Sequence, residues 1–321
     1  MLPKANLNPE ARRSHDLRNY LHTVILVGGS ALLVATIAWT VFGPQGLIWA
    51  AAATAIGIWT LGRVSPKMVL GLYKARPLTP DELPEIHRIV RELAARAGLP
   101  TVPHLYYVPS KMLNAFAVGR KEDSAIAVTD GLIRSMNLRQ LAGILAHETA
   151  HIRNGDLKVM GLADVLNRIT SVISTVGWLG IPIIFGTNWQ VPIYALALMI
   201  AAPTIGGLLQ LALSRTREYD ADLDGATLTG DPEGLASALA FLERKQRGIW
   251  EGLALPGGRV PEPSMLRTHP KTEDRIKRLM ALRHDATQPA IVVEGSPHPG
   301  RSIIPPIRNP RVQWQRMGLW Y

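Results

Sequence analysis

The sequence contains no cysteine, and this absence excludes several classes of protein. Disulfide-stabilised scaffolds, iron–sulfur proteins and enzymes with a cysteine nucleophile all need thiol groups. Acidic residues are also scarce: 25 Asp and Glu stand against 35 Lys and Arg, which gives a formal net charge of +10. A basic balance can serve nucleic-acid binding, but here the charges are distributed in a way that favours a membrane.

Long stretches of the chain carry no charge at all. Neither Asn19–Gly62 nor Ile169–Ser214 contains an Asp, Glu, Lys or Arg. About 20 apolar residues cross a bilayer as a helix, so each stretch is long enough for two spans. Turn-forming residues interrupt both stretches, at Gly43–Gly46 and at Gly186–Gln190. The sequence therefore predicts four transmembrane helices in two hairpins, near Tyr20–Phe42, Leu47–Leu61, Ile169–Phe185 and Ile193–Leu213.

The flanks of these stretches indicate their orientation. A secretory signal peptide would have one short apolar core and a cleavage site, whereas the first stretch is too long and continues into a second span. Lys and Arg flank both hairpins, and neither hairpin tip carries any. The positive-inside rule then places both chain ends and the large polar segments in the cytoplasm. The positive charge reflects this topology and attraction to anionic lipid headgroups, and no nucleic-acid partner is expected.

Two long polar segments, one between the hairpins and one after the second hairpin, are together long enough for one core-forming domain. The second hairpin is then an insertion into that domain. The Pro-rich C-terminal tail is expected either to be extended or to dock onto the domain or the membrane surface. The expected organisation is an N-terminal tail (1–18), a first hairpin (19–62), a first domain half (63–168), a second hairpin (169–214), a second domain half (215–282) and the tail (283–321).

The polar segments show alternating helix and strand signals. Thr79 and Glu82 form a capping-box pattern that predicts a helix ending at Gly98. Three strand-like runs follow, and Asn137 and Gly155 delimit a further helix. The expected strands are His104–Val108, Asn114–Val118 and Ala125–Thr129, and the later helices are Leu138–Asn154, Asp231 to about Arg247 and Thr268 to about Arg283. This order predicts an α+β fold with a small sheet.

The stretch His147-Glu148-Thr149-Ala150-His151 carries the clearest chemical signal. Two histidines at positions i and i+4 fall on one face of the expected helix and can share a zinc ion, while Glu148 can act as general base on a water. A plain surface or core histidine pair is the alternative, but apolar neighbours on the same helix disfavour a solvated face. Catalytic zinc needs a third protein ligand and an open position. Glu218 is the best candidate, and Asp222 can support a ligand histidine; the alternative is a solvated acidic helix start.

Together with the two hairpins, the motifs HETAH, REYDAD, NAFAVG and THPKTEDRI resemble the HtpX-type membrane zinc metalloproteases. These are bacterial and archaeal relatives of the CAAX prenyl protease and of the mitochondrial protease Oma. The resemblance implies a mainly helical, gluzincin-like domain with an inserted membrane hairpin, in the bacterial or archaeal cytoplasmic (inner) membrane. It also implies one Zn²⁺ per chain, with ligands His147, His151 and Glu218, catalytic Glu148 and supporting Asp222.

The resemblance further identifies Asn114, Ala115, Phe116 and Ala117 as an edge strand for substrate; a plain core strand is the alternative. His269 matches a late His-Pro and is either an oxyanion or positioning group or a simple helix entry. Arg275 is expected on a solvated helix face, and pairing with an acid near the site is the alternative. The implied function is a zinc endopeptidase that cleaves misfolded or damaged membrane proteins or unfolded polypeptides at the cytoplasmic face. A prenyl-protein protease and a non-catalytic zinc scaffold are the alternatives, and the oligomeric state stays open.

Overall fold

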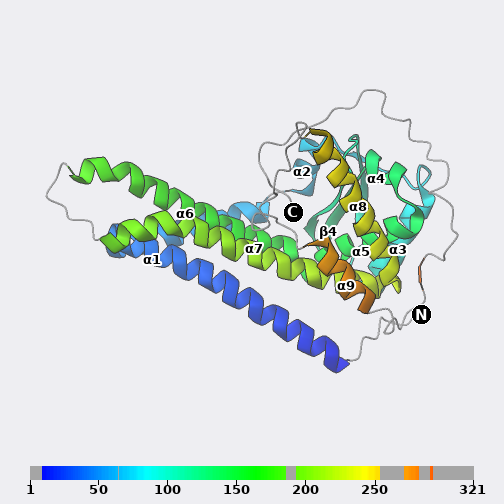
Figure 1. Cartoon of the computed structure of the whole chain (residues 1–321), viewed down its shortest axis with the longest axis horizontal. Helices are drawn as coiled ribbons and strands as arrows, with labels where there is room; N and C mark the ends of the chain where they lie inside the picture. Colours follow the sequence, from blue (N-terminus) through cyan, green and yellow to red (C-terminus); the bar gives the residue numbers. More distant parts are fainter. Residues whose placement is uncertain (1–8, 64, 186–192, 254–270, 282–289, 292–321) are drawn as a thin grey trace. The chain divides into compact units, whose positions relative to one another are not determined.

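The computed structural model describes residues 9–63, 65–185, 193–253, 271–281 and 290–291 (Figure 1). The chain divides into two compact units. The sheet unit comprises Met1–Arg13, Ser65–Leu157 and Arg217–Tyr321, and the apolar unit comprises Ser14–Val64 and Lys158–Thr216. Each unit is therefore assembled from segments that are separated in the sequence.

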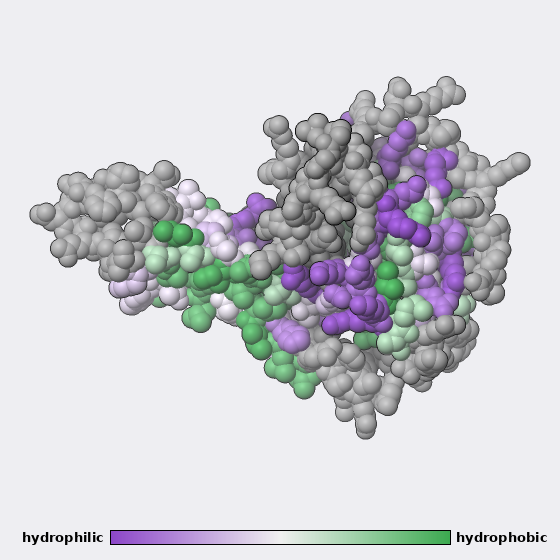
Figure 2. All heavy atoms as spheres, in the orientation of Figure 1, coloured by the Kyte–Doolittle hydropathy of each residue, from purple (hydrophilic) through white to green (hydrophobic). Residues whose placement is uncertain are grey.

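The apolar unit is built from long helices whose visible surface is largely hydrophobic (Figure 2). They are α1 (Pro9–Arg63), most of α6 (Asp156–Phe185) and the first part of α7 (Ile193–Thr229). Within the described residues, three helical segments are long and apolar enough to cross a membrane: Tyr20–Thr60, Asp156–Val176 and Ala197–Thr229. The structure thus gives three candidate membrane helices where the sequence predicted four.

The number of candidate membrane helices is lower than predicted because α1 counts as one helix, although its backbone is broken near the middle. Gly43 has φ 64° and ψ −152°, which is not helical, and Pro44 follows it. This backbone conformation is open to glycine and strained for other residues. Beyond the break the chain turns back, because Ala38 and Ala50 belong to the same buried cluster, whereas a straight helix would hold them about 18 Å apart. Helix α1 therefore consists of two helical segments that pack against each other.

The sheet of the sheet unit has the order β1-β2-β4-β3 within the described residues. Strand β2 runs parallel to β4, and the other pairs are antiparallel. The strands are β1 (Arg76–Pro77), β2 (His104–Val108), β3 (Ala115–Arg120) and β4 (Asp123–Thr129). One face packs in the main core through Ala117, Ile126 and Val128. The opposite face is covered by the short helix α2 (Pro66–Leu72).

Several elements differ from their predicted bounds. Helix α3 (Pro84–Ala97) ends before Gly98 as expected but begins at Pro84 instead of near Thr79. The reason is that a residue preceding proline is disfavoured in helical geometry, and Leu83 has φ −145° and ψ 71°. The Thr79–Glu82 segment forms a separate turn, in which the Thr79 N–H donates to the Glu82 carboxylate.

The later helices are α8 (Pro232–Leu253) and α9 (Thr272–Ala281). Strand β1 and helices α2 and α4 (Asp130–Ser135) were not predicted.

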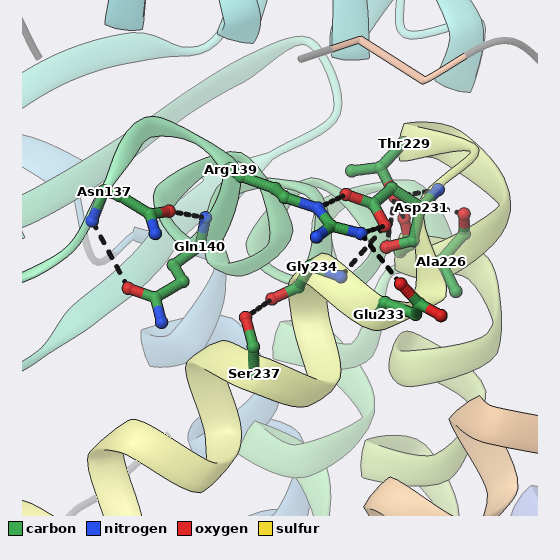
Figure 3. A network of polar contacts seen from close by, with 10 residues as sticks. Asn137, Arg139, Gln140, Ala226, Thr229, Asp231, Glu233, Gly234 and Ser237 are labelled. Carbon is green, nitrogen blue, oxygen red and sulfur yellow. Dashed lines mark hydrogen bonds and ion pairs between the residues drawn. The ribbon is translucent and has the colours of Figure 1, made fainter. Parts of the chain in front are cut away.

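Helix α5 (Leu138–Asn154) has the predicted bounds. Asn137 and Gln140 form a capping box at its start, and Gly155 ends it with φ 70°. Arg139 points at the acidic start of α8 and donates to Asp231 and Glu233 (Figure 3). The two helices also approach closely at Gly143, where a Cβ would come within 2.8 Å of Leu235 Cα. These contacts hold the N-terminal half of α5 against α8 and thereby position the side chains of its C-terminal half.

Candidate metal centre

The two histidines of α5 face the same point. His147 and His151 lie one helical turn apart, so their rings project from one face. Their Nε2 atoms are 3.1 Å apart. His147 is buried and His151 is half-buried. The helix that the sequence predicted from its caps therefore presents a pair of imidazoles in partly water-excluded surroundings.

Glu218 of α7 completes a group of three possible ligands. Its carboxylate oxygens lie 3.5 Å from His147 Nε2 and 3.8 Å from His151 Nε2. One ligand atom from each of the three residues lies within 4.8 Å of the others. Helix α7 can come this close because Gly225 has no side chain: a Cβ there would lie 3.1 Å from the backbone nitrogen of His147.

This donor set fits zinc. Tetrahedral zinc with bonds of about 2.0–2.1 Å holds its ligand atoms about 3.3 Å apart. The two Nε2 atoms, 3.1 Å apart, are close to that value, and the nearest Glu218 oxygens lie slightly farther away, Oε2 at 3.5 Å from His147 and Oε1 at 3.8 Å from His151. Two imidazoles and one carboxylate are also a recurrent protein set at catalytic zinc, which keeps its fourth position open.

Each histidine is backed by an aspartate on its other nitrogen. Asp222 Oδ1 lies 3.1 Å from His147 Nδ1, and Asp156 Oδ2 lies 2.8 Å from His151 Nδ1. Burial lowers the pKa of both imidazoles, but the facing carboxylates outweigh it, raising the pKa of His147 to about 10 and that of His151 above its usual range. A metal at this site would therefore displace protons when it binds.

Two arginines hold the supporting aspartates. The guanidinium of Arg275, on α9, donates two hydrogen bonds of 2.7 Å to Asp222 and lies 3.2 Å from Glu218 Oε2. Arg217 lies 3.1 Å from Asp156. The expectation of a solvated Arg275 is wrong, because only 6% of this residue is exposed. Burying a guanidinium is tolerable only with such paired carboxylates.

Glu148 links α5 to the sheet. Its Oε2 accepts a hydrogen bond of 2.9 Å from the backbone N–H of Ala117 in β3. Burial raises the pKa of Glu148, and the neighbouring imidazoles His147 and His151 oppose that shift. A carboxylate with a raised pKa, beside a group of metal ligands, has the character of a general base.

Strand β3 offers one edge for pairing. Among the described residues it pairs with β4 alone, through the register Phe116↔Ala127. The Ala117 N–H points away from β4 toward Glu148, and backbone groups alternate along an antiparallel strand. The outward groups are therefore those of Ala115, Ala117 and Gly119. Phe116 instead packs its ring against Tyr73 on the α2 side, with centroids 4.8 Å apart.

Of the two remaining predicted site residues, Asn114 and His269, the structure describes only Asn114. Asn114 precedes β3, and its carbonyl accepts a hydrogen bond from the Thr129 N–H of β4. His269 lies outside the described residues. Sequence reasoning missed Asp156 and Arg217 and misjudged Arg275. A usable signal existed for Asp156, which follows the helix-ending Gly155 directly and so returns toward the last turn of α5.

Comparisons with known proteins show the family to which this chain is similar. The model of peptidase family M48 matches residues 80–283. The Protease HtpX homolog of Acaryochloris marina is 38% identical over 286 residues, covering 82% of this chain and 94% of the relative. The Protease HtpX homolog of Ralstonia nicotianae is 33% identical over 296 residues, covering 85% of this chain and 99% of the relative.

A solved structure shows the same fold. The crystal structure of S. mikatae Ste24p matches with a TM-score of 0.51 at 19% identity, covering 82% of this chain and 65% of Ste24p. At that identity the likeness concerns the fold alone. The candidate membrane helices and the bacterial HtpX relatives make this chain an integral membrane protein. From the extent of the family match and the identity to these relatives, the chain belongs to peptidase family M48.

Proposed function

We propose that this protein is a membrane-embedded zinc endopeptidase. His147, His151 and Glu218 hold the metal, and Glu148 is the general base. The observation that carries the proposal is the position of Glu148, whose carboxylate is hydrogen-bonded to the edge strand β3 while its helix carries both histidines. The base thus stands between the candidate metal ligands and a strand edge to which a polypeptide can bind.

The side chains of this centre have distinct tasks. When bound, zinc supplies Lewis acidity toward the scissile carbonyl and toward water. Glu148 accepts a proton from the attacking water and returns it to the leaving amine. Asp222 and Asp156 hold His147 and His151 in the tautomer that directs Nε2 at the metal, and Arg275 keeps Asp222 ionised. His269 remains a candidate for oxyanion stabilisation by its sequence match.

The substrate binds as an added strand. Asn114, Ala115, Phe116 and Ala117 lead into and form the first part of β3, whose outward backbone groups can pair with an extended peptide. Because Phe116 packs on the other face of the sheet, the peptide meets backbone and small alanine side chains. Recognition through backbone groups gives broad sequence tolerance, which suits misfolded or damaged membrane proteins as substrates.

We place the active site on the cytoplasmic side of a four-span protein. The break at Gly43 supports two spans within α1, because Tyr20–Thr60 as one straight helix would be about 60 Å long, twice the apolar thickness of a bilayer. The Lys and Arg residues that flank both hairpins support the cytoplasmic orientation. We also propose a role in membrane-protein quality control, which the sequence resemblance to HtpX-type proteases implies; the relatives named as HtpX protease homologues support that resemblance.

A paired measurement of metal content and proteolysis tests the proposal. The detergent-purified protein and its Glu148→Gln variant are compared for bound zinc and for cleavage of casein. We expect about one zinc per chain in both and cleavage only by the unmodified protein, because the amide retains the shape of the carboxylate but cannot accept the proton. The matched control is Glu122→Gln, at an exposed position. Equal cleavage by the Glu148→Gln variant would refute the assignment of the base, and zinc without cleavage in any form would indicate a scaffold.

A further inference from the structure

The short helix α2 exposes two large apolar side chains. Met68 is 66% exposed and Leu72 is 68% exposed, whereas Leu70 between them is 2% exposed. Met68 and Leu72 are four residues apart and so lie on the same side of the helix. Leu70, with Val69 and Tyr73, instead packs on the sheet. The helix therefore has one apolar side against the protein and a second apolar side without a described protein contact.

The position of α2 in the chain indicates what covers its second apolar side. The helix begins at Pro66, six residues after Thr60, the last residue of a candidate membrane helix. Six residues span at most about 20 Å when fully extended, so α2 starts near the point where the chain leaves the bilayer core. A helix with exposed apolar side chains at this depth lies close to the boundary between headgroups and acyl chains.

The charges around α2 suit a lipid surface. No Asp or Glu occurs between Asp16 and Asp81, whereas Lys67, in the first turn of α2, and Lys74, just after its end, are exposed. Long basic side chains at an interface reach toward headgroups while their stems lie along the apolar layer. Each such charge near an anionic membrane surface adds electrostatic attraction to the lipid headgroups.

We propose that α2 is an interfacial membrane anchor, with Met68 and Leu72 inserted among lipid acyl chains and Lys67 and Lys74 at anionic headgroups. The anchor bears directly on β3. Pro66 of α2 packs on Gly119 of β3, where a Cβ would come within 3.0 Å of Pro66 Cγ. Lipid contact by α2 therefore holds the strand that lies beside Glu148 at a fixed depth relative to the membrane surface.

The absence of native cysteine allows a direct test. Single cysteines replace Met68, Leu72 or, as a matched control, Met280, an exposed methionine of α9 (39%). Each is introduced into the full chain carrying Glu148→Gln, labelled with the fluorophore NBD and reconstituted into phosphatidylcholine–phosphatidylglycerol vesicles. Quenching is measured with a lipid bearing a nitroxide at acyl carbon 5 and, separately, with aqueous iodide. This readout needs no proteolytic activity.

If α2 is such an anchor, the nitroxide lipid should quench the label several-fold more strongly at positions 68 and 72 than at position 280. Iodide should quench the label more strongly at position 280 than at positions 68 and 72. Iodide quenching at 68 and 72 equal to that at 280 would show that α2 faces water and would overturn the proposal. Protection from both quenchers would show that another protein surface, such as a second copy of this chain, covers α2, and would also overturn it. Substituting the exposed Ser65, at the start of α2, by cysteine checks that a label there reports a shallower depth.

Discussion

Arg275 contacts two carboxylates of the candidate metal centre at once, Asp222 and Glu218. Replacing it by alanine leaves both acids without this partner, so we expect zinc affinity to fall 10- to 100-fold, the usual loss when a supporting group of a metal ligand is removed. Arg275→Lys should be intermediate, because an ammonium cannot form the two parallel bonds of the guanidinium. Competition with a chromophoric chelator measures the affinities.

Lys277→Ala, on the exposed side of the same helix, is the matched control. It removes the same charge without touching the centre and should leave zinc affinity unchanged. An Arg275→Lys protein that is folded and binds zinc as tightly as the unmodified protein would contradict the positioning role.

Glu82 makes the stability of the sheet unit depend on pH. Its hydrogen bonds, first with Arg76 and then with the Thr79 N–H, lower the pKa of this carboxyl from 4.5 to about 2. A lowered pKa in the folded state means that the stabilisation is complete above pH 4.5 and is lost as the pH falls toward 2. Glu82→Gln should therefore reduce the unfolding free energy by about 1 kcal/mol at pH 7 and by less at pH 3.

Thermal unfolding followed by circular dichroism at both pH values measures this dependence. The control is Glu85→Gln, whose side chain is 47% exposed in a surface pair with Arg88. A loss for Glu82→Gln that stays the same at pH 3 and pH 7 would rule out the ionised carboxylate as its cause.

At the residue scale, the sequence identified what depends on local spacing. The HExxH histidines and Glu148 could be placed because a helix with caps at Asn137 and Gly155 fixes their relative directions. Arg275 could not be placed, because its partner Asp222 is 53 positions away in the chain and only tertiary packing brings them together.

At the scale of elements, the close packing of α5 against α8 depends on Gly143, because glycine has no side chain. A Cβ on Gly143 would lie 2.8 Å from Leu235 Cα and 2.9 Å from its nitrogen, and backbone atoms cannot turn aside as a flexible side chain can. Gly143→Ala should therefore force the helices apart and cost about 1–3 kcal/mol, despite the better helix propensity of alanine. Chemical denaturation in detergent measures the change.

Gly71→Ala in α2 is the control, because no atom lies within 4 Å of the added Cβ. Here the propensity gain stands alone, and stability should stay equal or rise by up to about 1 kcal/mol. Gly143→Ala should therefore destabilise the protein and Gly71→Ala should not, and a stabilised Gly143→Ala protein would refute the close contact.

Elements were predictable where they were long or strongly capped. The bounds of β2 and α5 agree with the sequence prediction. Strand β1 has two residues and α2 has seven, too few for a periodic pattern, and each is stabilised by the sheet it covers or extends. The start of α3 was missed because the pre-proline restriction at Leu83 outweighs a good capping pattern upstream.

At the scale of the whole molecule, the candidate ligands come from two of the three segments of the sheet unit: His147 and His151 from Ser65–Leu157, and Glu218 from Arg217–Tyr321. A metal bound by all three residues would therefore cross-link these two segments. Zinc at a thousandfold excess over its dissociation constant should stabilise the folded protein by about 4 kcal/mol, and a chelator should remove that stabilisation. Thermal unfolding with chelator, and after zinc is restored, measures both.

His151→Ala is the control, since it removes one ligand and leaves the helix intact. Its unfolding temperature should not respond to zinc or chelator at the same concentrations. A zinc response of unchanged size in this variant would mean that zinc binds elsewhere in the chain.

If substrate pairs along the edge of β3 opposite β4, as proposed, that edge determines how the protein distinguishes its targets. Only a segment that has left its own helix or sheet would pair there, and cleavage would then follow the population of locally opened substrate. Two targets with the same residues at the cut site would then differ in lifetime according to their local unfolding free energies, tenfold for about 1.4 kcal/mol. The protein would act as a sensor of conformational stability rather than a reader of sequence.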